Sequence, residues 1–118
     1  YVVSDVTFTD EIKVTEESEF YQRIKAMDSE VTQLIIKSFE AFFKELFPAT
    51  FMHDPLTLST LIDAEIVRFE ERKLEMDEAG RIVTTASAKS HQVSIEADYT
   101  SFWKLFKPRV VEFLQRQS

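Results

Sequence analysis

The chain has 118 residues, near the commonest size of one domain, and its 44% apolar and 30% charged residues are ordinary for a globular protein. Its formal net charge of -7, without any run of Lys and Arg longer than a pair, excludes nucleic acid as an expected partner. No apolar run approaches the roughly 18 residues that span a membrane, and the lack of Cys excludes disulfides and thiolate chemistry, so we expect a cytoplasmic protein.

The N-terminal part predicts a short extended start followed by a helix. Residues 1–3, Tyr-Val-Val, form an apolar run typical of a strand, and residues 4–14 are rich in Ser, Thr and Asp. We expect the latter to form a loop or a short extended piece. Thr15 is a suitable N-cap for a helix over residues 16–27, because Ser, Thr, Asp and Asn accept hydrogen bonds from the first free N–H groups.

The clearest helix is predicted over residues 28–47, where a wide apolar stripe recurs at helical spacing. Asp28 or Ser29 is expected to cap its start, and Pro48 just beyond its end is a normal stop signal. A second, shorter helix is expected to begin near Pro55, because proline is favoured in the first turn of a helix.

The second half of the chain changes from helical to strand-like patterning. Charged and apolar residues mix over residues 65–76, as in an exposed strand, and Gly80 follows where a hairpin turn needs it. Residues 81–88 and 92–97 are two further strand candidates, the latter with clean alternation. The charged hairpin that these segments predict reads as a solvated face.

The chain ends in a predicted helix over residues 98–114, with Asp98 or Thr100 as its cap. Pro108 lies inside this helix, so a kink or a break is expected there. Strand, helices, two or three strands and a final helix give an α+β appearance, or part of an α/β fold.

The chemistry available to the chain is concentrated at His53-Asp54-Pro55. His53 exchanges a proton near neutral pH, and Asp54 is a hard oxygen ligand suited to Ca²⁺ or Mg²⁺. Adjacent residues at a helix start point in different directions, so one residue is free to hold a metal while the other faces a leaving group. Taken alone, however, the tripeptide is more often a turn and capping arrangement. One carboxylate also cannot make a Ca²⁺ site, which needs about six to eight oxygens.

Other candidate residues carry weaker signals. His91 lies beside a predicted exposed strand and reads as a surface residue, while Asp5 reads as a turn residue. Trp103 and the Phe residues around it are typical of a core or an interface. The chain contains neither a Ser-centred nucleophile elbow nor a phosphate-binding glycine loop.

Three segments, in this order, resemble the C-terminal part of the inosine–uridine nucleoside hydrolase family. The first is VVSDVTFTDEIKVTEE at residues 2–17, and the second is FMHDPLTLSTLID at residues 51–63. The third runs over residues 72–106, from RKLEMDEAGRIVTT to QVSIEADYTSFWKLF, and includes a D-x-x-x-F step at Asp98 and Phe102. The resemblance covers essentially the whole chain, and the ordered combination is more specific than the His-Asp-Pro tripeptide alone.

This resemblance implies an α/β fold class, with residues 1–118 as the C-terminal segment of one open, mixed-sheet, Rossmann-like domain whose N-terminal metal-binding part is absent. It implies hydrolysis of the N-glycosidic bond of purine or pyrimidine ribonucleosides to base and ribose, with Ca²⁺ and an activated water. Asp54 would then be a Ca²⁺ ligand that also contacts the ribose. His53 would lie on the leaving-group side, as a proton donor or stabiliser of the departing base.

The chain also departs from the family pattern. The aspartate cluster that supplies most Ca²⁺ ligands is absent, and Phe8 stands where many members have His. We therefore expect residues 1–118 alone to bind Ca²⁺ poorly and to hydrolyse no nucleoside.

The expected partners are a ribonucleoside in the full protein and either a second copy or the missing N-terminal part. Two alternatives remain open: a non-catalytic interaction or scaffold module derived from that fold, and an unrelated α+β domain with a chance His-Asp-Pro.

Overall fold

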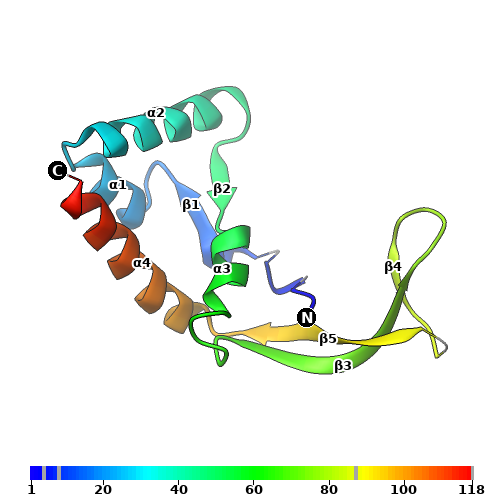
Figure 1. Ribbon diagram of the computed structural model, residues 1–118. Coiled ribbons are helices and arrows are strands. Elements are labelled where there is room, and N and C mark those ends of the chain that lie inside the picture. The colour runs from blue at the N-terminus through cyan, green and yellow to red at the C-terminus, as the bar shows by residue number, and fades with distance from the viewer. Residues whose placement is uncertain (4, 8, 87, 118) are drawn as a thin grey trace.

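The computed structural model describes residues 1–3, 5–7, 9–86 and 88–117, which form helices around two small antiparallel sheets (Figure 1). Phe8, for which the sequence assigned no role, lies outside the described residues. In chain order the elements are the 3₁₀ turns η1 (Asp5–Thr7) and η2 (Asp10–Ile12), β1 (Lys13–Thr15), α1 (Glu19–Lys25), α2 (Glu30–Glu45), β2 (Ala49–Phe51), α3 (His53–Ser59), β3 (Val67–Met76), β4 (Ile82–Thr84), β5 (Lys89–Ala97) and α4 (Tyr99–Arg116).

The strands pair as a two-stranded sheet, β1-β2, and a three-stranded sheet in the order β4-β3-β5. Lys13 lies opposite Phe51 in the first sheet. At the N-terminus the expected strand is reduced to one residue, because Val2 alone forms a parallel bridge, with Val93 of β5. Gly80 adopts a φ of 81° in the β3–β4 turn, as the hairpin prediction requires. The described residues thus have the expected mixed α and β character, and their sheets are antiparallel.

The starts of α1 and α2 differ in their side-chain capping. The prediction that Thr15 caps the first helix is wrong: the Thr15 N–H donates to the Ser18 Oγ (2.8 Å) in a tight turn, and α1 begins after Ser18. At the start of α2 the Ser29 Oγ accepts the Thr32 N–H (3.1 Å), which confirms Ser29 as the cap. Ser29 therefore caps α2 with its side chain, whereas the Ser18 side chain makes no such hydrogen bond to the start of α1.

The final helix is continuous through Pro108, so the predicted break is wrong. Phe102, Val111 and Leu114 are buried on both sides of the proline, and their packing holds the two halves in one helix. The carbonyl of Lys104 that the proline leaves without its usual donor belongs to an exposed residue, where water can replace the bond.

Replacing Asp98 with Ala is expected to lower the melting temperature at pH 7 and to lower it less at pH 2. The Asp98 carboxylate accepts hydrogen bonds from the Ser101 hydroxyl (2.6 Å) and the Ser101 N–H (3.0 Å), and these lower its pKa from the ordinary value of 3.8. Because the folded-state pKa is the lower one, the stabilisation is present above pH of about 4 and is lost as the pH falls through the folded-state pKa. Thermal unfolding followed by circular dichroism at both pH values tests this, and equal losses at the two values would contradict it.

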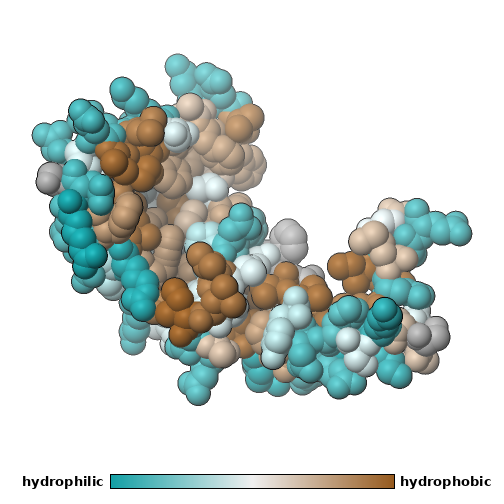
Figure 2. Space-filling model, in the orientation of Figure 1, coloured by the Kyte–Doolittle hydropathy of each residue, from teal (hydrophilic) through white to brown (hydrophobic). Residues whose placement is uncertain are grey.

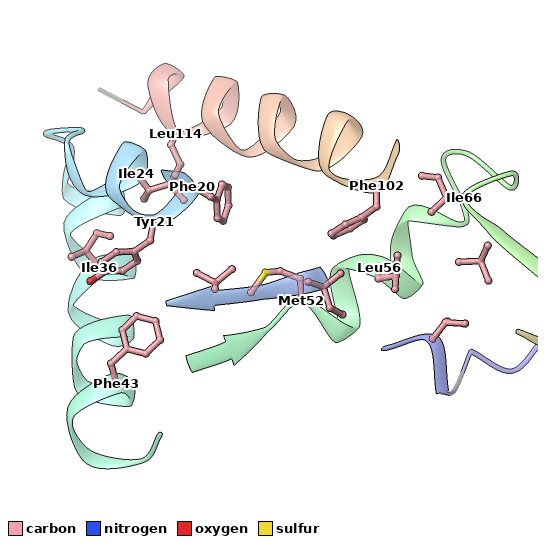
Figure 3. Packing of buried hydrophobic residues seen from close by; sticks show 14 residues of the cluster. Phe20, Tyr21, Ile24, Ile36, Phe43, Met52, Leu56, Ile66, Phe102 and Leu114 are labelled. Carbon is pink, nitrogen blue, oxygen red and sulfur yellow. The ribbon is translucent and has the colours of Figure 1, made fainter. Parts of the chain in front are cut away.

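The hydrophobic core lies where α1, α2, α3 and α4 surround the β1-β2 sheet. Figure 3 shows Phe102 pointing from α4 toward α3, where Leu56 lies, and Tyr21 pointing toward α2. The apolar stripe predicted on α2 is only partly buried. The predicted stripe consists of Val31, Leu34, Ile35, Phe39, Phe42, Phe43 and Leu46. Of these only Phe43 is buried and Leu34 is exposed, whereas Ile36, outside the predicted stripe, is buried.

The molecule is elongated rather than compact. Its radius of gyration is 17.3 Å, whereas a compact chain of this length has a radius of about 13.5 Å. Figure 1 shows the reason: β3 and β5 form an arm that leaves the helical body and carries β4 at its far end. Among the described residues, no helix has the length and apolar character needed to cross a bilayer.

Large apolar side chains remain exposed on this elongated surface (Figure 2). Several lie on or just after α2 and α3 and on the β3–β4 hairpin, and they include Leu34, Leu46, Leu58, Leu61, Ile62, Met76 and Ile82. Single exposed apolar residues are normal, but groups of them are typical of surfaces that another element or a partner protein covers.

Candidate functional site

The His-Asp-Pro tripeptide forms the first turn of α3, immediately after β2. His53 is the first residue of the helix, and Met52 precedes it without a side-chain hydrogen bond to the helix start. Pro55 is the third residue, where its missing N–H costs no intrahelical hydrogen bond because the first N–H groups of a helix have no partner within it. The expected helix start near Pro55 is therefore confirmed.

The β1-β2 sheet fixes this turn against η2. The Met52 N–H donates to the Ile12 carbonyl (2.9 Å), which continues the antiparallel ladder one step beyond the Lys13–Phe51 pair. The residues that precede β1 therefore lie beside the residues that follow β2. This pairing brings Thr9 and Asp10 next to the start of α3.

His53 lines a hollow of 470 Å³ together with Thr9, Asp10 and Phe51. Its ring is half-buried and stacks on Phe51, with ring centroids 5.6 Å apart and planes 24° from parallel. The stack fixes the plane of the imidazole, and Asp10 and Thr9 are further lining residues among those that the structure describes. The hollow therefore joins one group able to exchange a proton, one acidic group and one aromatic face.

Asp54 is exposed and lines a different, mostly apolar hollow of 570 Å³ between α3 and α4. Leu58, Phe102 and Arg109 are among its other walls. The two adjacent residues of the tripeptide thus face different hollows, as expected for neighbours at a helix start. A further hollow, of 740 Å³, runs along α4 beside Arg23, and neither His53 nor Asp54 lines it.

The three segments that resemble the nucleoside hydrolases meet at α3. Turn η1 lies against α3, and the Tyr99 hydroxyl at the start of α4 donates to the Val6 carbonyl (2.6 Å). Burial, and secondly the charge of Glu11, raises the pKa of Tyr99, so the hydroxyl remains a donor. On α4, Phe102 packs into the same core as Val6 and Leu56. Segments far apart in the sequence are therefore assembled around the tripeptide.

A complete metal site is not formed by the part of the chain that the structure describes. No group of three or more His, Cys, Asp and Glu there is placed to hold an ion. Asp54 supplies a single carboxylate, and Ca²⁺ takes about six to eight oxygens. A Ca²⁺ ion at Asp54 would therefore need ligands from other polypeptide.

The remaining sequence candidates lie away from the tripeptide or have no described side chain. His91 is exposed on β5, as predicted. Asp5 belongs to the 3₁₀ turn η1, in agreement with its interpretation as a turn residue. Sequence reasoning missed Thr9 and Asp10, because only the register of β1 against β2 brings them to His53.

Comparison with known proteins gives a likeness of fold. Neither a family model nor a curated protein matches the sequence. Among solved structures, the chain is similar to a plant nucleoside hydrolase, the PpNRh1 enzyme, with a TM-score of 0.71 and 13% sequence identity. The match covers 92% of this chain and 39% of the enzyme, so the chain spans about two fifths of that protein's length. The chain therefore has the mixed α/β fold of part of a nucleoside hydrolase.

Proposed function

We propose that residues 1–118 are the C-terminal segment of a nucleoside hydrolase domain of the inosine–uridine type. The observation that carries this proposal is the likeness of fold to a nucleoside hydrolase over 92% of the chain. The reaction is hydrolysis of the N-glycosidic bond of a ribonucleoside to free base and ribose. The natural protein would act on nucleosides in the cytoplasm, in purine and pyrimidine salvage.

In this proposal Asp54 contributes one carboxylate to a Ca²⁺ site and contacts the ribose, and the other metal ligands come from polypeptide outside this chain. A bound Ca²⁺ would supply an activated water for attack at C1′ of the ribose, and the proton that this water loses would pass to a base outside this chain. A bond would form between the water oxygen and C1′ while the C1′–N bond breaks, with positive charge on the sugar in the transition state. The exposure of Asp54 at the start of α3 leaves its carboxylate accessible to such a site.

His53 serves the other half of the reaction, the departure of the base. The broken C1′–N bond leaves its electron pair on the base nitrogen, and a proton given by His53 would neutralise the charge that develops there. Stacking on Phe51 holds the imidazole plane fixed, so the proton donor needs little reorganisation. The site is complete only with the metal ligands of the missing part.

The second candidate is a non-catalytic module that kept the fold and binds a partner. The elongated shape and the exposed apolar residues of α2 and α3 favour association with another chain, a second copy or the missing part. DNA upstream of the Tyr1 codon separates the two candidates. An in-frame stretch that encodes an aspartate cluster supports the enzyme, whereas a start codon immediately upstream supports the module.

Replacing His53 with Ala in the natural protein that carries this chain is expected to lower kcat for inosine hydrolysis by about 10²-fold, the usual contribution of a general acid. The matched control is His91→Ala on the exposed strand β5, which should leave kcat unchanged. Release of free base, followed by its absorbance change, gives both rates. Equal rates for the two variants would remove His53 from the reaction.

A further inference from the structure

We infer that Asp10, which lines one hollow with Thr9, Phe51 and His53, selects bases with adjacent N–H donors, guanine above all. The identity of the ligand rests on the proposed function, because a nucleoside hydrolase must hold the base beside its proton donor. The inference adds a specificity-determining residue that the His-Asp-Pro motif does not contain.

The backbone that carries Asp10 is anchored on both sides. The Trp103 indole N–H donates to the Glu11 carbonyl (2.7 Å), which ties the turn η2 to α4. The Thr9 Oγ accepts the Glu11 N–H (3.3 Å), and Ile12 is fully buried. Together with the Met52–Ile12 hydrogen bond, these contacts hold Asp10 at a fixed place relative to His53. A site needs this kind of support to discriminate between similar ligands.

The walls of the hollow match the flat aromatic face and the hydrogen-bonding edge of a nucleobase. The stacked rings of Phe51 and His53 are an aromatic surface of the kind on which bases stack. The hollow of 470 Å³ lies within the range of about 300–1,000 Å³ found for small-molecule sites. A planar heterocycle is thus a better occupant than a sugar or an aliphatic ligand.

Asp10 determines which base edge fits. Within the described part of the chain the Asp10 carboxylate forms neither an ion pair nor a hydrogen bond. Its oxygens are therefore available to accept hydrogen bonds from a ligand. An ionised carboxylate only accepts, and two parallel hydrogen bonds are its strongest arrangement. The guanine edge offers two adjacent donors, N1–H and the 2-amino group. Hypoxanthine offers only N1–H, and adenine places an acceptor at N1, which the carboxylate repels.

The test uses the 118-residue chain and its two histidines, whose imidazole protons are followed by NMR during titration with nucleosides. Guanosine is expected to shift the His53 signal and to bind about tenfold more tightly than inosine, in line with the discrimination that one bidentate pair gives. The exposed His91 is the internal control and should not shift. Asp10→Asn should reduce the guanosine preference to less than about twofold, because an amide cannot accept both donors. The matched control Glu17→Gln, an exposed acidic residue outside the hollow, should keep the full preference.

Equal affinities for guanosine and inosine, or an unchanged preference in Asp10→Asn, would overturn the inference. An indole N–H signal of Trp103 at the same NMR chemical shift as in the wild-type chain shows that the variant is folded. The outcome is independent of catalysis by the natural protein. If guanosine binds with the Asp10 preference but the natural protein hydrolyses no nucleoside, the proposed function fails and the subsite stands. If hydrolysis occurs and Asp10→Asn leaves the ratio of guanosine to inosine kcat/KM unchanged, the subsite fails and the function stands.

Discussion

Replacing Asp54 with Ala in the natural protein that carries this chain is expected to lower kcat/KM for inosine by at least about 10³-fold, the usual scale for losing metal-assisted water activation. If Asp54 holds Ca²⁺ as proposed, its removal weakens Ca²⁺ binding and removes a contact to the ribose. The variant should also need far more Ca²⁺ to reach its residual rate. Steady-state kinetics against Ca²⁺ concentration measure both effects.

Two controls test whether the effect comes from the charge of Asp54, and not from its shape or from the loss of any exposed carboxylate. Asp54→Asn keeps the shape, removes the negative charge and should lose most of the activity as well. Glu112→Ala removes an exposed carboxylate from α4 and should leave the rate and its Ca²⁺ dependence unchanged. Full activity of Asp54→Ala would show that Asp54 does not hold the metal.

Replacing Phe102 with Ala is expected to lower the free energy of unfolding of the 118-residue chain by about 3–5 kcal/mol, the cost of emptying a buried aromatic site. The Phe102 side chain is fully buried. Its ring lies 5.1 Å from Trp103 and 5.3 Å from Phe106, centroid to centroid, and it packs α4 onto α3. Urea unfolding followed by circular dichroism at 222 nm, a standard wavelength for helix, measures the loss.

The matched control for this substitution is Phe113→Ala on the same helix. The Phe113 side chain is 56% exposed, so its truncation should cost less than about 1 kcal/mol. Equal unfolding midpoints for the two variants would contradict the placement of the core between α3 and α4. The comparison is matched because both substitutions remove the same atoms from one helix.

Much of the fold follows from local signals in the sequence. The helix expected over residues 28–47 forms as α2, because Ser29 caps it and Pro48 lies beyond its end. The hairpin at Gly80 forms because a positive φ is needed there and glycine adopts it without strain. These features depend on a few neighbouring residues, which is the range over which sequence patterns are informative.

Features that depend on distant contacts escaped prediction. One local feature escaped as well: the sequence does not show that α1 begins after Ser18 rather than after Thr15, since both residues have a hydroxyl and the turn between them decides. Nor does it show that core packing carries α4 through Pro108. The exposure of Leu34 depends likewise on which elements cover α2, and this is set by tertiary structure alone.

The candidate site also has one part that the sequence predicts and one part that depends on non-local strand pairing. His53 and Asp54 are adjacent, so the motif and its helix start are recognisable from the sequence, and so is their divergence to different hollows. Asp10 is 43 positions before His53 in the printed sequence, and only the β1-β2 register brings it to the same hollow. Non-local pairing of short strands leaves too weak a pattern to be predicted.

The most direct test of the proposed function compares nucleoside hydrolysis by residues 1–118 with hydrolysis by the natural protein that carries them, both with Ca²⁺ and with inosine or uridine. We expect free base and ribose from the natural protein and neither product from the 118-residue chain, which lacks a complete metal site among its described residues. Hydrolysis by the pure 118-residue chain, or its absence from the natural protein, would contradict the account.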